Sequence, residues 1–209
     1  MTMSLARTLW DANKDWAERI LAHGFVQGLA DGSLPAASFK AYIAQDAYFL
    51  DAYARAYALC LAHGTSRDDL YVFSELIAGV VEELKLHKGL SERLQIDLAD
   101  VTPIAATDAY VGFLLETARR GQLGETIAAM APCTRLYSFL GHTLARGPVA
   151  PAYADWVKTY ADPLFEGLAA RLDGLLDIHA TDSEAVRANY RRAMELEYGF
   201  FDANLQRCA

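Results

Sequence analysis

Hydrophobic residues recur every third or fourth position along most of the chain, which places them on one face of an α-helix. Glycine and proline separate these periodic segments, so they mark the expected helix ends. The pattern predicts helices over residues 4–23, 35–63, 66–89, 107–121, 124–146, 152–160, 163–178 and 181–206, with a turn at 24–35 and a polar loop at 94–107. Capping-box starts are expected at Ser66 with Asp69 and at Thr181 with Glu184. The sequence therefore predicts an all-α fold, a single-domain helical bundle of about eight helices over residues 1–209.

Composition supports helices over strands, because 37 alanines and 28 leucines stand against nine valines and seven isoleucines. The 27 acidic residues outnumber the 19 basic ones, which argues against general binding to nucleic acid or to an anionic membrane surface. No apolar run approaches the roughly 18 residues of a membrane span, and the start lacks a secretory-signal pattern. Three cysteines cannot all form disulfides with one another. We expect a cytoplasmic protein with reduced thiols and neither a nucleic-acid nor a membrane partner.

Two carboxylates fall within hydrophobic stripes. Asp46 lies in the middle of the apolar face predicted for residues 35–63, and Glu197 lies among aromatic residues on the last helix. Burial against aromatic rings raises the pKa of a carboxyl group, as a general acid or base at neutral pH requires. The structural alternatives are a hydrogen bond from a tyrosine or lysine to Asp46, and a salt bridge from Arg135 to Glu197.

The helix predicted over 124–146 contains a candidate nucleophile, Cys133. Tyr137 follows one turn later on the same face, and Pro132 removes a backbone donor just before the cysteine, so the helix is expected to kink there. A lone buried cysteine is more often a small hydrophobic residue. Cys60 and Cys208 are expected to play that structural role.

Aromatic residues offer a binding surface for a flat ring. If the helix faces converge, six of them line one cavity suited to a nitrogen-rich heterocycle: Tyr48, Phe49, Tyr110, Tyr137, Tyr160 and Tyr198. A di-iron site is disfavoured, because no glutamate is followed by histidine three residues later. Glu83 and His87 form a single pair with the spacing i, i+4, which we interpret as structural or as an oligomer contact. A haem held by His23 stays open as an alternative.

The sequence resembles the TenA family, known as thiaminase II or aminopyrimidine aminohydrolase. The resemblance rests on Phe25-Val-Gln-Gly-Leu-Ala-Asp-Gly-Ser-Leu-Pro35, Phe39-Lys-Ala-Tyr-Ile-Ala-Gln-Asp-Ala-Tyr-Phe49, Ala131-Pro-Cys-Thr-Arg-Leu-Tyr137, Thr159-Tyr160 and Met194-Glu-Leu-Glu-Tyr-Gly-Phe-Phe201. It implies an all-α, haem-oxygenase-like bundle without haem or metal, usually a homotetramer. The implied reaction converts 4-amino-5-aminomethyl-2-methylpyrimidine to the hydroxymethylpyrimidine and ammonia, and many members also hydrolyse thiamin.

The same resemblance implies a role for each matching residue. Cys133 matches the nucleophile, Glu197 the acid/base and Asp46 the acid that holds the aminopyrimidine edge. The remaining matches are aromatic: Tyr110 and Tyr137 as active-site phenols, and Phe49 and Tyr160 as the rings on either side of the substrate. The chain departs from some members at Phe49, where they carry tyrosine, and at Thr134 and Arg135, where they carry an aromatic pair. The alternative function is a non-catalytic protein that binds a pyrimidine or a regulatory partner on this fold.

Overall fold

Ten α-helices and one short 3₁₀ helix form the regular structure of residues 4–98 and 100–206, the part of the chain that the computed structural model describes. Their bounds are α1 (Leu5–Ala12), α2 (Lys14–Leu21), α3 (Gly24–Asp31), α4 (Ala36–His63), α5 (Arg67–Leu94), α6 (Ala105–Arg119), α7 (Leu123–Leu144), η1 (Pro151–Tyr153), α8 (Ala154–Tyr160), α9 (Pro163–His179) and α10 (Glu184–Gln206). The all-α fold is confirmed, with more and shorter helices than the predicted eight.

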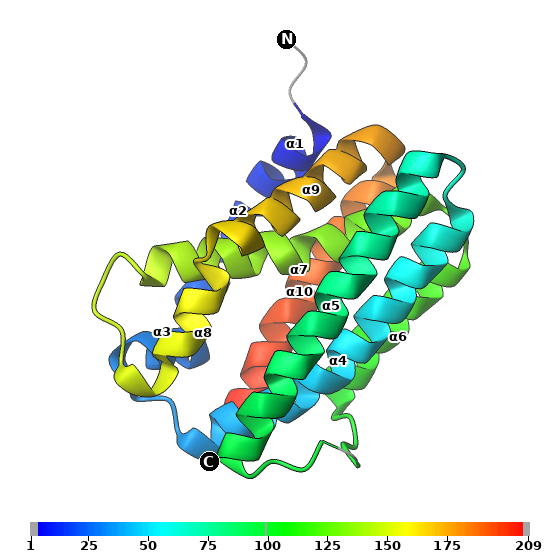
Figure 1. Cartoon of the computed structure of the whole chain (residues 1–209). Helices are drawn as coiled ribbons and strands as arrows, with labels where there is room; N and C mark the ends of the chain where they lie inside the picture. The colour runs from blue at the N-terminus through cyan, green and yellow to red at the C-terminus, as the bar shows by residue number, and fades with distance from the viewer. Residues whose placement is uncertain (1–3, 99, 207–209) are drawn as a thin grey trace.

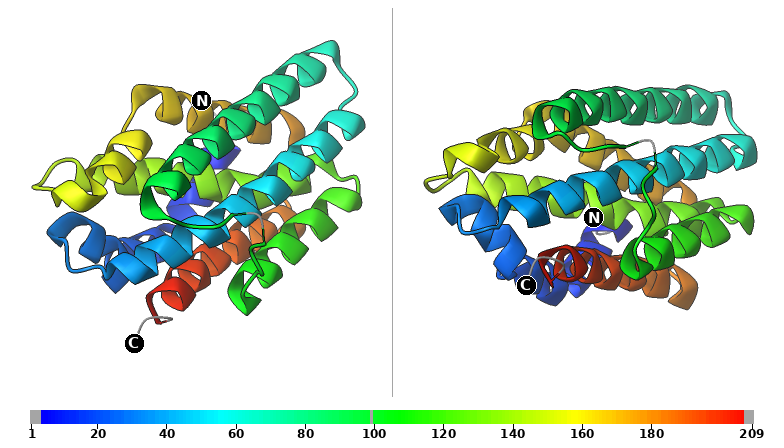
Figure 2. Two further views of the ribbon diagram at one scale, coloured as in Figure 1. Left: turned by 60° about the horizontal axis from the view of Figure 1, so that its bottom comes forward. Right: turned by 90° about the horizontal axis from the view of Figure 1, so that it is seen from below.

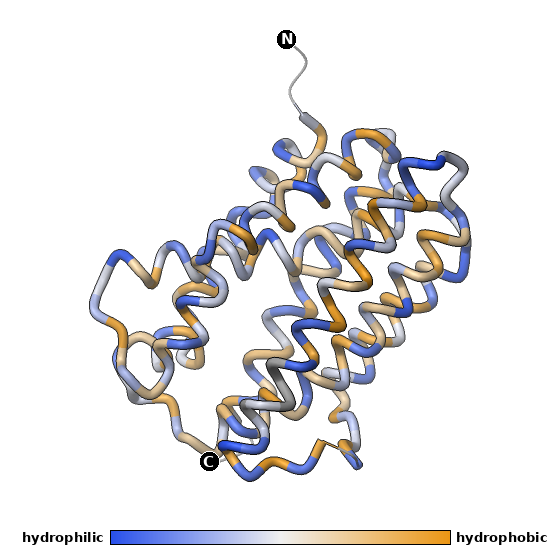
Figure 3. Tube along the Cα trace, in the orientation of Figure 1, coloured by the Kyte–Doolittle hydropathy of each residue, from blue (hydrophilic) through white to orange (hydrophobic). Residues whose placement is uncertain are grey.

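The long helices form the frame of the molecule. α4 packs against α5 and α6, with α10 behind them, and α7 crosses this group to reach α8 and α9 (Figures 1 and 2). Every α-helix contributes to one cluster of buried hydrophobic residues. Along the tube of Figure 3, hydrophobic and hydrophilic residues alternate with the helical period, as expected when each helix turns one face to a shared core.

The structure corrects the N-terminal prediction at two places. The helix expected over 4–23 is broken at Asn13, whose side-chain amide donates to the Leu9 carbonyl at 2.8 Å. The turn expected at 24–35 contains α3, which the ring of His23 caps by accepting from the Phe25 amide at 3.1 Å. Burial of Phe25 and Leu29 in the core stabilises this short helix despite its two glycines.

The other boundaries agree more closely. The capping box of Ser66 and Asp69 is confirmed at the start of α5, but α5 continues to Leu94 instead of ending near Gly89. The capping box at Thr181 is wrong: α10 begins at Glu184, and the Ser183 hydroxyl accepts from the Val186 amide at 3.2 Å. None of the described helices is long and apolar enough to cross a membrane.

Candidate active site

A cavity within the bundle is lined by side chains from α4, α5, α7, α8 and α9. Its polar and aromatic lining includes Asp46 and Phe49 from α4, Glu83 from α5, Cys133 and Tyr137 from α7, and Tyr160 from α8. Five of the seven predicted site residues therefore face one space. The other two, Tyr110 and Glu197, lie behind its wall and contact each other.

Glu197 reaches this region from α10 and is 1% exposed. Burial raises the pKa of its carboxyl from 4.5 to about 7, although hydrogen bonds from Tyr110 and Cys133 oppose the rise. The negative charge of Asp46 raises the pKa further. A carboxyl with a pKa near neutrality can both accept and release a proton at working pH, as acid–base catalysis requires.

Cys133 is half-buried, and its exposed surface belongs to the cavity wall. Burial raises the pKa of its thiol well above the ordinary 9, and the nearby negative charges of Glu197 and Asp46 raise it further. The thiol is consequently protonated at neutral pH and is not by itself a nucleophile. Glu197 is its candidate base, because the two groups interact with each other directly.

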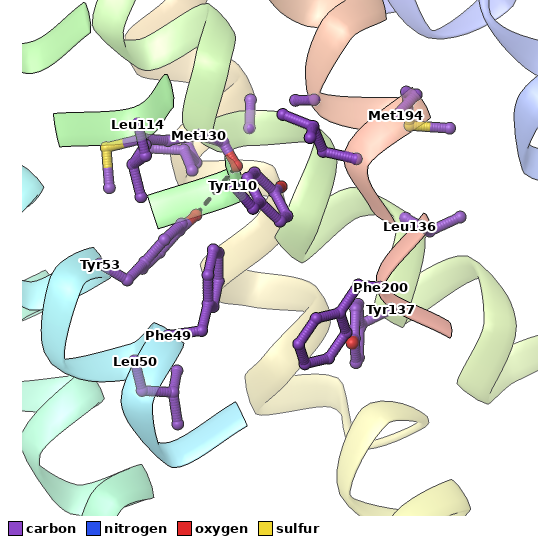
Figure 4. Close-up of a cluster of buried hydrophobic side chains, with 14 of the residues drawn as sticks. Phe49, Leu50, Tyr53, Tyr110, Leu114, Met130, Leu136, Tyr137, Met194 and Phe200 are labelled. Atoms are coloured by element: carbon purple, nitrogen blue, oxygen red, sulfur yellow. Dashed lines mark hydrogen bonds between the residues drawn. The ribbon is translucent and has the colours of Figure 1, made fainter. Parts of the chain in front are cut away.

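Two buried tyrosines, Tyr110 and Tyr53, form hydrogen bonds next to Glu197 and Cys133, and Figure 4 shows both tyrosines with Phe49 and Met130. The Tyr110 hydroxyl donates to Oε1 of Glu197 at 2.8 Å, and the ring of Phe49 packs against the Tyr110 ring with centroids 4.6 Å apart. The Tyr53 hydroxyl donates to the Met130 carbonyl at 2.9 Å, one turn before Cys133 on α7. α7 continues through Pro132, which has no N–H for the preceding turn.

A second hydrogen-bonded chain orients Tyr137. The Trp156 indole donates to the Tyr42 hydroxyl at 3.3 Å, and Tyr42 donates to the Tyr137 hydroxyl at 3.2 Å. Tyr42 is fully buried on α4 and is not among the predicted site residues. Only packing between α4, α7 and α8 shows that its hydroxyl supports a residue of the cavity.

Arg135 does not pair with Glu197, so that structural alternative is wrong. Its guanidinium instead donates to Glu166 at 2.8 and 3.0 Å and to Asp173 at 2.6 and 2.9 Å. These bonds join α7 to α9, and none of the three residues lines the cavity. Glu197 is therefore left in contact with the phenol and the thiol.

Besides Tyr110, two of the six aromatic residues expected to line one cavity do not line it. Tyr48 is 36% exposed, and Tyr198 packs edge-on against Trp16 with ring centroids 5.7 Å apart, so neither lines the cavity. Glu83, which we interpret as half of a structural or oligomer-contact pair, also lies on the cavity wall and accepts from the Tyr160 hydroxyl at 3.3 Å. The side chain of its expected partner His87, like Cys208, lies outside the described part of the chain. Glu83 is far from the other site residues along the chain, so no sequence pattern assigns it to the site.

Comparisons with known proteins identify the family of this chain. The model of the TENA/THI-4/PQQC family matches residues 10–207. The chain belongs to this family. An aminopyrimidine aminohydrolase of Halalkalibacterium halodurans is 37% identical over 85% of this chain and 83% of that protein, and one of Bacillus subtilis is 28% identical over 95% and 89%. A solved structure described as a TenA family transcription regulator from Silicibacter has a TM-score of 0.90, with 26% identity over 96% of each chain.

Two positions at which this chain departs from some TenA members now have different surroundings. Thr134 lines the cavity, whereas Arg135 points to α9 and its carboxylates. Only Thr134 of this pair can therefore touch a molecule bound in the cavity.

Proposed function

We propose that this chain is an aminopyrimidine aminohydrolase of thiamin salvage. It hydrolyses 4-amino-5-aminomethyl-2-methylpyrimidine to 4-amino-5-hydroxymethyl-2-methylpyrimidine and ammonia, and it also accepts thiamin. The names of the Halalkalibacterium and Bacillus relatives support the activity. The observation that carries the proposal is that Cys133 and Asp46 line one cavity from two helices, while Glu197 from a third helix interacts with Cys133 directly behind the cavity wall.

The proton of the Cys133 thiol is the first to move. Glu197, with a pKa of about 7, takes this proton and passes it to a nitrogen of the pyrimidine ring as the sulfur bonds to a ring carbon. The thiol proton thus ends on the ring, and Glu197 returns to its carboxylate form. One proton shared by Cys133 and Glu197 is enough for this step, so the active pair is a thiol with a carboxylate.

The adduct then releases the leaving group. The lone pair of the N–H ring nitrogen in the adduct expels the amine from the 5-methylene. Because this amine is bound as an ammonium group, it departs as neutral ammonia. Water adds to the exocyclic methylene and gives a proton to Glu197. Loss of the ring proton and of the sulfur restores the aromatic ring and the thiol, and Glu197 gives the proton of the water to the released ammonia, which restores the carboxylate. Nucleophilic catalysis in this way replaces one difficult displacement by several easier steps.

Three other residues position the substrate in this proposal. The Asp46 carboxylate, 5% exposed on α4, accepts from the amino group of the pyrimidine and fixes the ring's edge. Phe49 and Tyr160 lie on the cavity wall from α4 and α8, where they hold the two faces of the ring. The Tyr110 phenol donates a hydrogen bond to Glu197, and the Tyr137 phenol forms part of the cavity wall.

Turnover by purified protein tests the proposal. The wild type and the Cys133→Ala variant are incubated with the aminomethylpyrimidine and separately with thiamin, and hydroxymethylpyrimidine is followed by chromatography. We expect product from the wild type and at least a thousandfold less from the variant, since removing a nucleophile from a coupled set costs about that much or more. A binding or regulatory protein would bind the pyrimidine equally well in both forms and make no product from either.

The assembly and location belong to the same proposal. We expect one domain that assembles into a homotetramer in the cytoplasm, as the family resemblance implies. Sedimentation of the purified protein measures the assembly directly, and a monomer at micromolar concentration would contradict it.

A further inference from the structure

A second, larger cavity adjoins the cavity around Cys133 and is lined by residues of α4, α5, η1 and α8; the two are called the outer chamber and the inner cavity below. The inner cavity has a volume of about 50 Å³ and the outer chamber about 380 Å³. Pockets for small molecules usually have volumes of roughly 300–1,000 Å³, so the inner cavity alone is too small for a substituted pyrimidine. A substrate that reaches Cys133 must therefore displace side chains of the lining, and the outer chamber is the adjoining space for the part that the inner cavity does not hold.

Among the described residues, Glu83 and Tyr160 are the two that line both spaces. Glu83 comes from α5 and Tyr160 from the end of α8, and the phenol donates to the carboxylate at 3.3 Å. Any group that leaves the inner cavity by way of the outer chamber passes these two side chains. In the described part of the chain, the junction thus consists of the Glu83 carboxylate and the Tyr160 phenol, next to aromatic and aliphatic side chains.

The negative charge of Glu83 acts on titratable groups around the inner cavity. It contributes to raising the pKa values of Cys133, Tyr57 and Tyr160, which lie around the same space. In the outer chamber, Arg93 and Asp155 form a pair at 3.8 Å with both side chains mostly exposed, so solvent screens their charges more strongly. The half-buried carboxylate at the junction is therefore well placed to act on a charged group bound there.

We infer that Glu83 is a specificity-determining residue that recognises a positive charge on the group attached to the 5-methylene of the pyrimidine. The inference rests on the proposed function, because the attack by Cys133 places the ring in the inner cavity and the substituent at the junction. The ammonium of the aminomethyl substrate and the cationic ring of thiamin both have such a charge, whereas the hydroxymethyl product is neutral. Loss of the charge on hydrolysis then favours release of the product past the same residue.

Binding measured without turnover tests this inference. In a Cys133→Ala background, calorimetry compares the affinity for the aminomethylpyrimidine with that for the hydroxymethylpyrimidine. We expect Glu83→Gln to weaken binding of the cationic ligand by about tenfold to a hundredfold, the usual worth of a charge-assisted hydrogen bond, and to change the neutral ligand by less than about twofold. Glu83→Asp, which keeps the charge, should recover part of the loss.

Glu82→Gln is the matched control, because Glu82 is the neighbouring glutamate on α5, is 68% exposed and pairs with Lys85 at 2.6 Å. It should leave both affinities unchanged. Equal weakening of both ligands by Glu83→Gln would show a structural role and overturn the inference, as would no weakening of either. Absence of turnover by the wild type would overturn the proposed function alone, since selective loss of the cationic ligand would still establish charge recognition at Glu83.

Discussion

Replacing Glu197 by glutamine should make the protein more stable at alkaline pH while removing its activity. The amide keeps the shape of the side chain and an oxygen that can accept from Tyr110 at 2.8 Å. It removes only the charge, which the buried position disfavours. The perturbation therefore isolates the cost of ionising a carboxyl that is 1% exposed.

The size of the effect follows from the raised pKa. The pKa is about 7 in the folded chain against 4.5 for an ordinary glutamate, and about 1.4 kcal/mol per pKa unit makes the full difference about 3 kcal/mol. Because the folded state holds the proton more tightly than the unfolded state, the contribution of Glu197 to stability is lost as pH rises from about 4.5 through 7. Between about pH 5 and pH 8, the free energy of unfolding of the wild type should fall by about 2–3 kcal/mol relative to the variant.

Urea unfolding of the two proteins at several pH values measures this difference. The protein concentration is held constant, because assembly would otherwise contribute to apparent stability. The contributions of other titrating groups to stability cancel, because only the difference in the free energy of unfolding between wild type and Glu197→Gln is compared. Glu195→Gln, on the same helix but 33% exposed and paired with Arg192 at 3.2 Å, reports the effect of removing a carboxylate near the surface.

Two results would refute the reasoning. A gap between wild type and Glu197→Gln that is the same at every pH would show that the carboxyl titrates alike in the folded and unfolded chains. A variant that loses stability relative to the wild type as pH rises would show that the folded protein stabilises the carboxylate, contrary to its burial among Tyr110, Cys133 and Asp46.

The remaining predictions concern the geometry around the same pair. Tyr110→Phe removes a hydrogen bond that lowers the pKa of Glu197. The acidic limb of the pH profile of kcat/KM, expected near pH 7, should therefore move to higher pH by about half a unit to one unit. A limb that does not move would contradict its assignment to Glu197. Gly141→Ala places a Cβ against the Tyr160 backbone, so α8 and its phenol must shift; we expect a loss of about 1–3 kcal/mol in the free energy of unfolding in urea and a higher KM. Gly174→Ala, with open space around it, is the control. Equal free energies of unfolding of the two variants would contradict the close packing of α7 on α8.

Much of the fold could be predicted from local patterns. The boundaries of α4, α7 and α9 follow from hydrophobic periodicity together with glycine and proline, and the start of α5 from its capping box. The prediction was wrong over the first 35 residues, where a buried asparagine breaks one helix and a histidine cap with two buried side chains creates another. Those features depend on contacts with the rest of the core, which periodicity does not describe.

The candidate site, like the fold, could be predicted only in part from the sequence. The sequence by itself determined that Asp46, Cys133 and Glu197 lie on apolar helix faces, because polar residues at core positions interrupt an otherwise regular stripe. Only the tertiary structure decided that the three faces converge, that Arg135 turns to α9, and that Glu83 joins Tyr160 at the junction of two cavities. The physical reason is that periodicity gives the face of each helix, whereas the partner that a face meets depends on how helices far apart in the chain cross and pack.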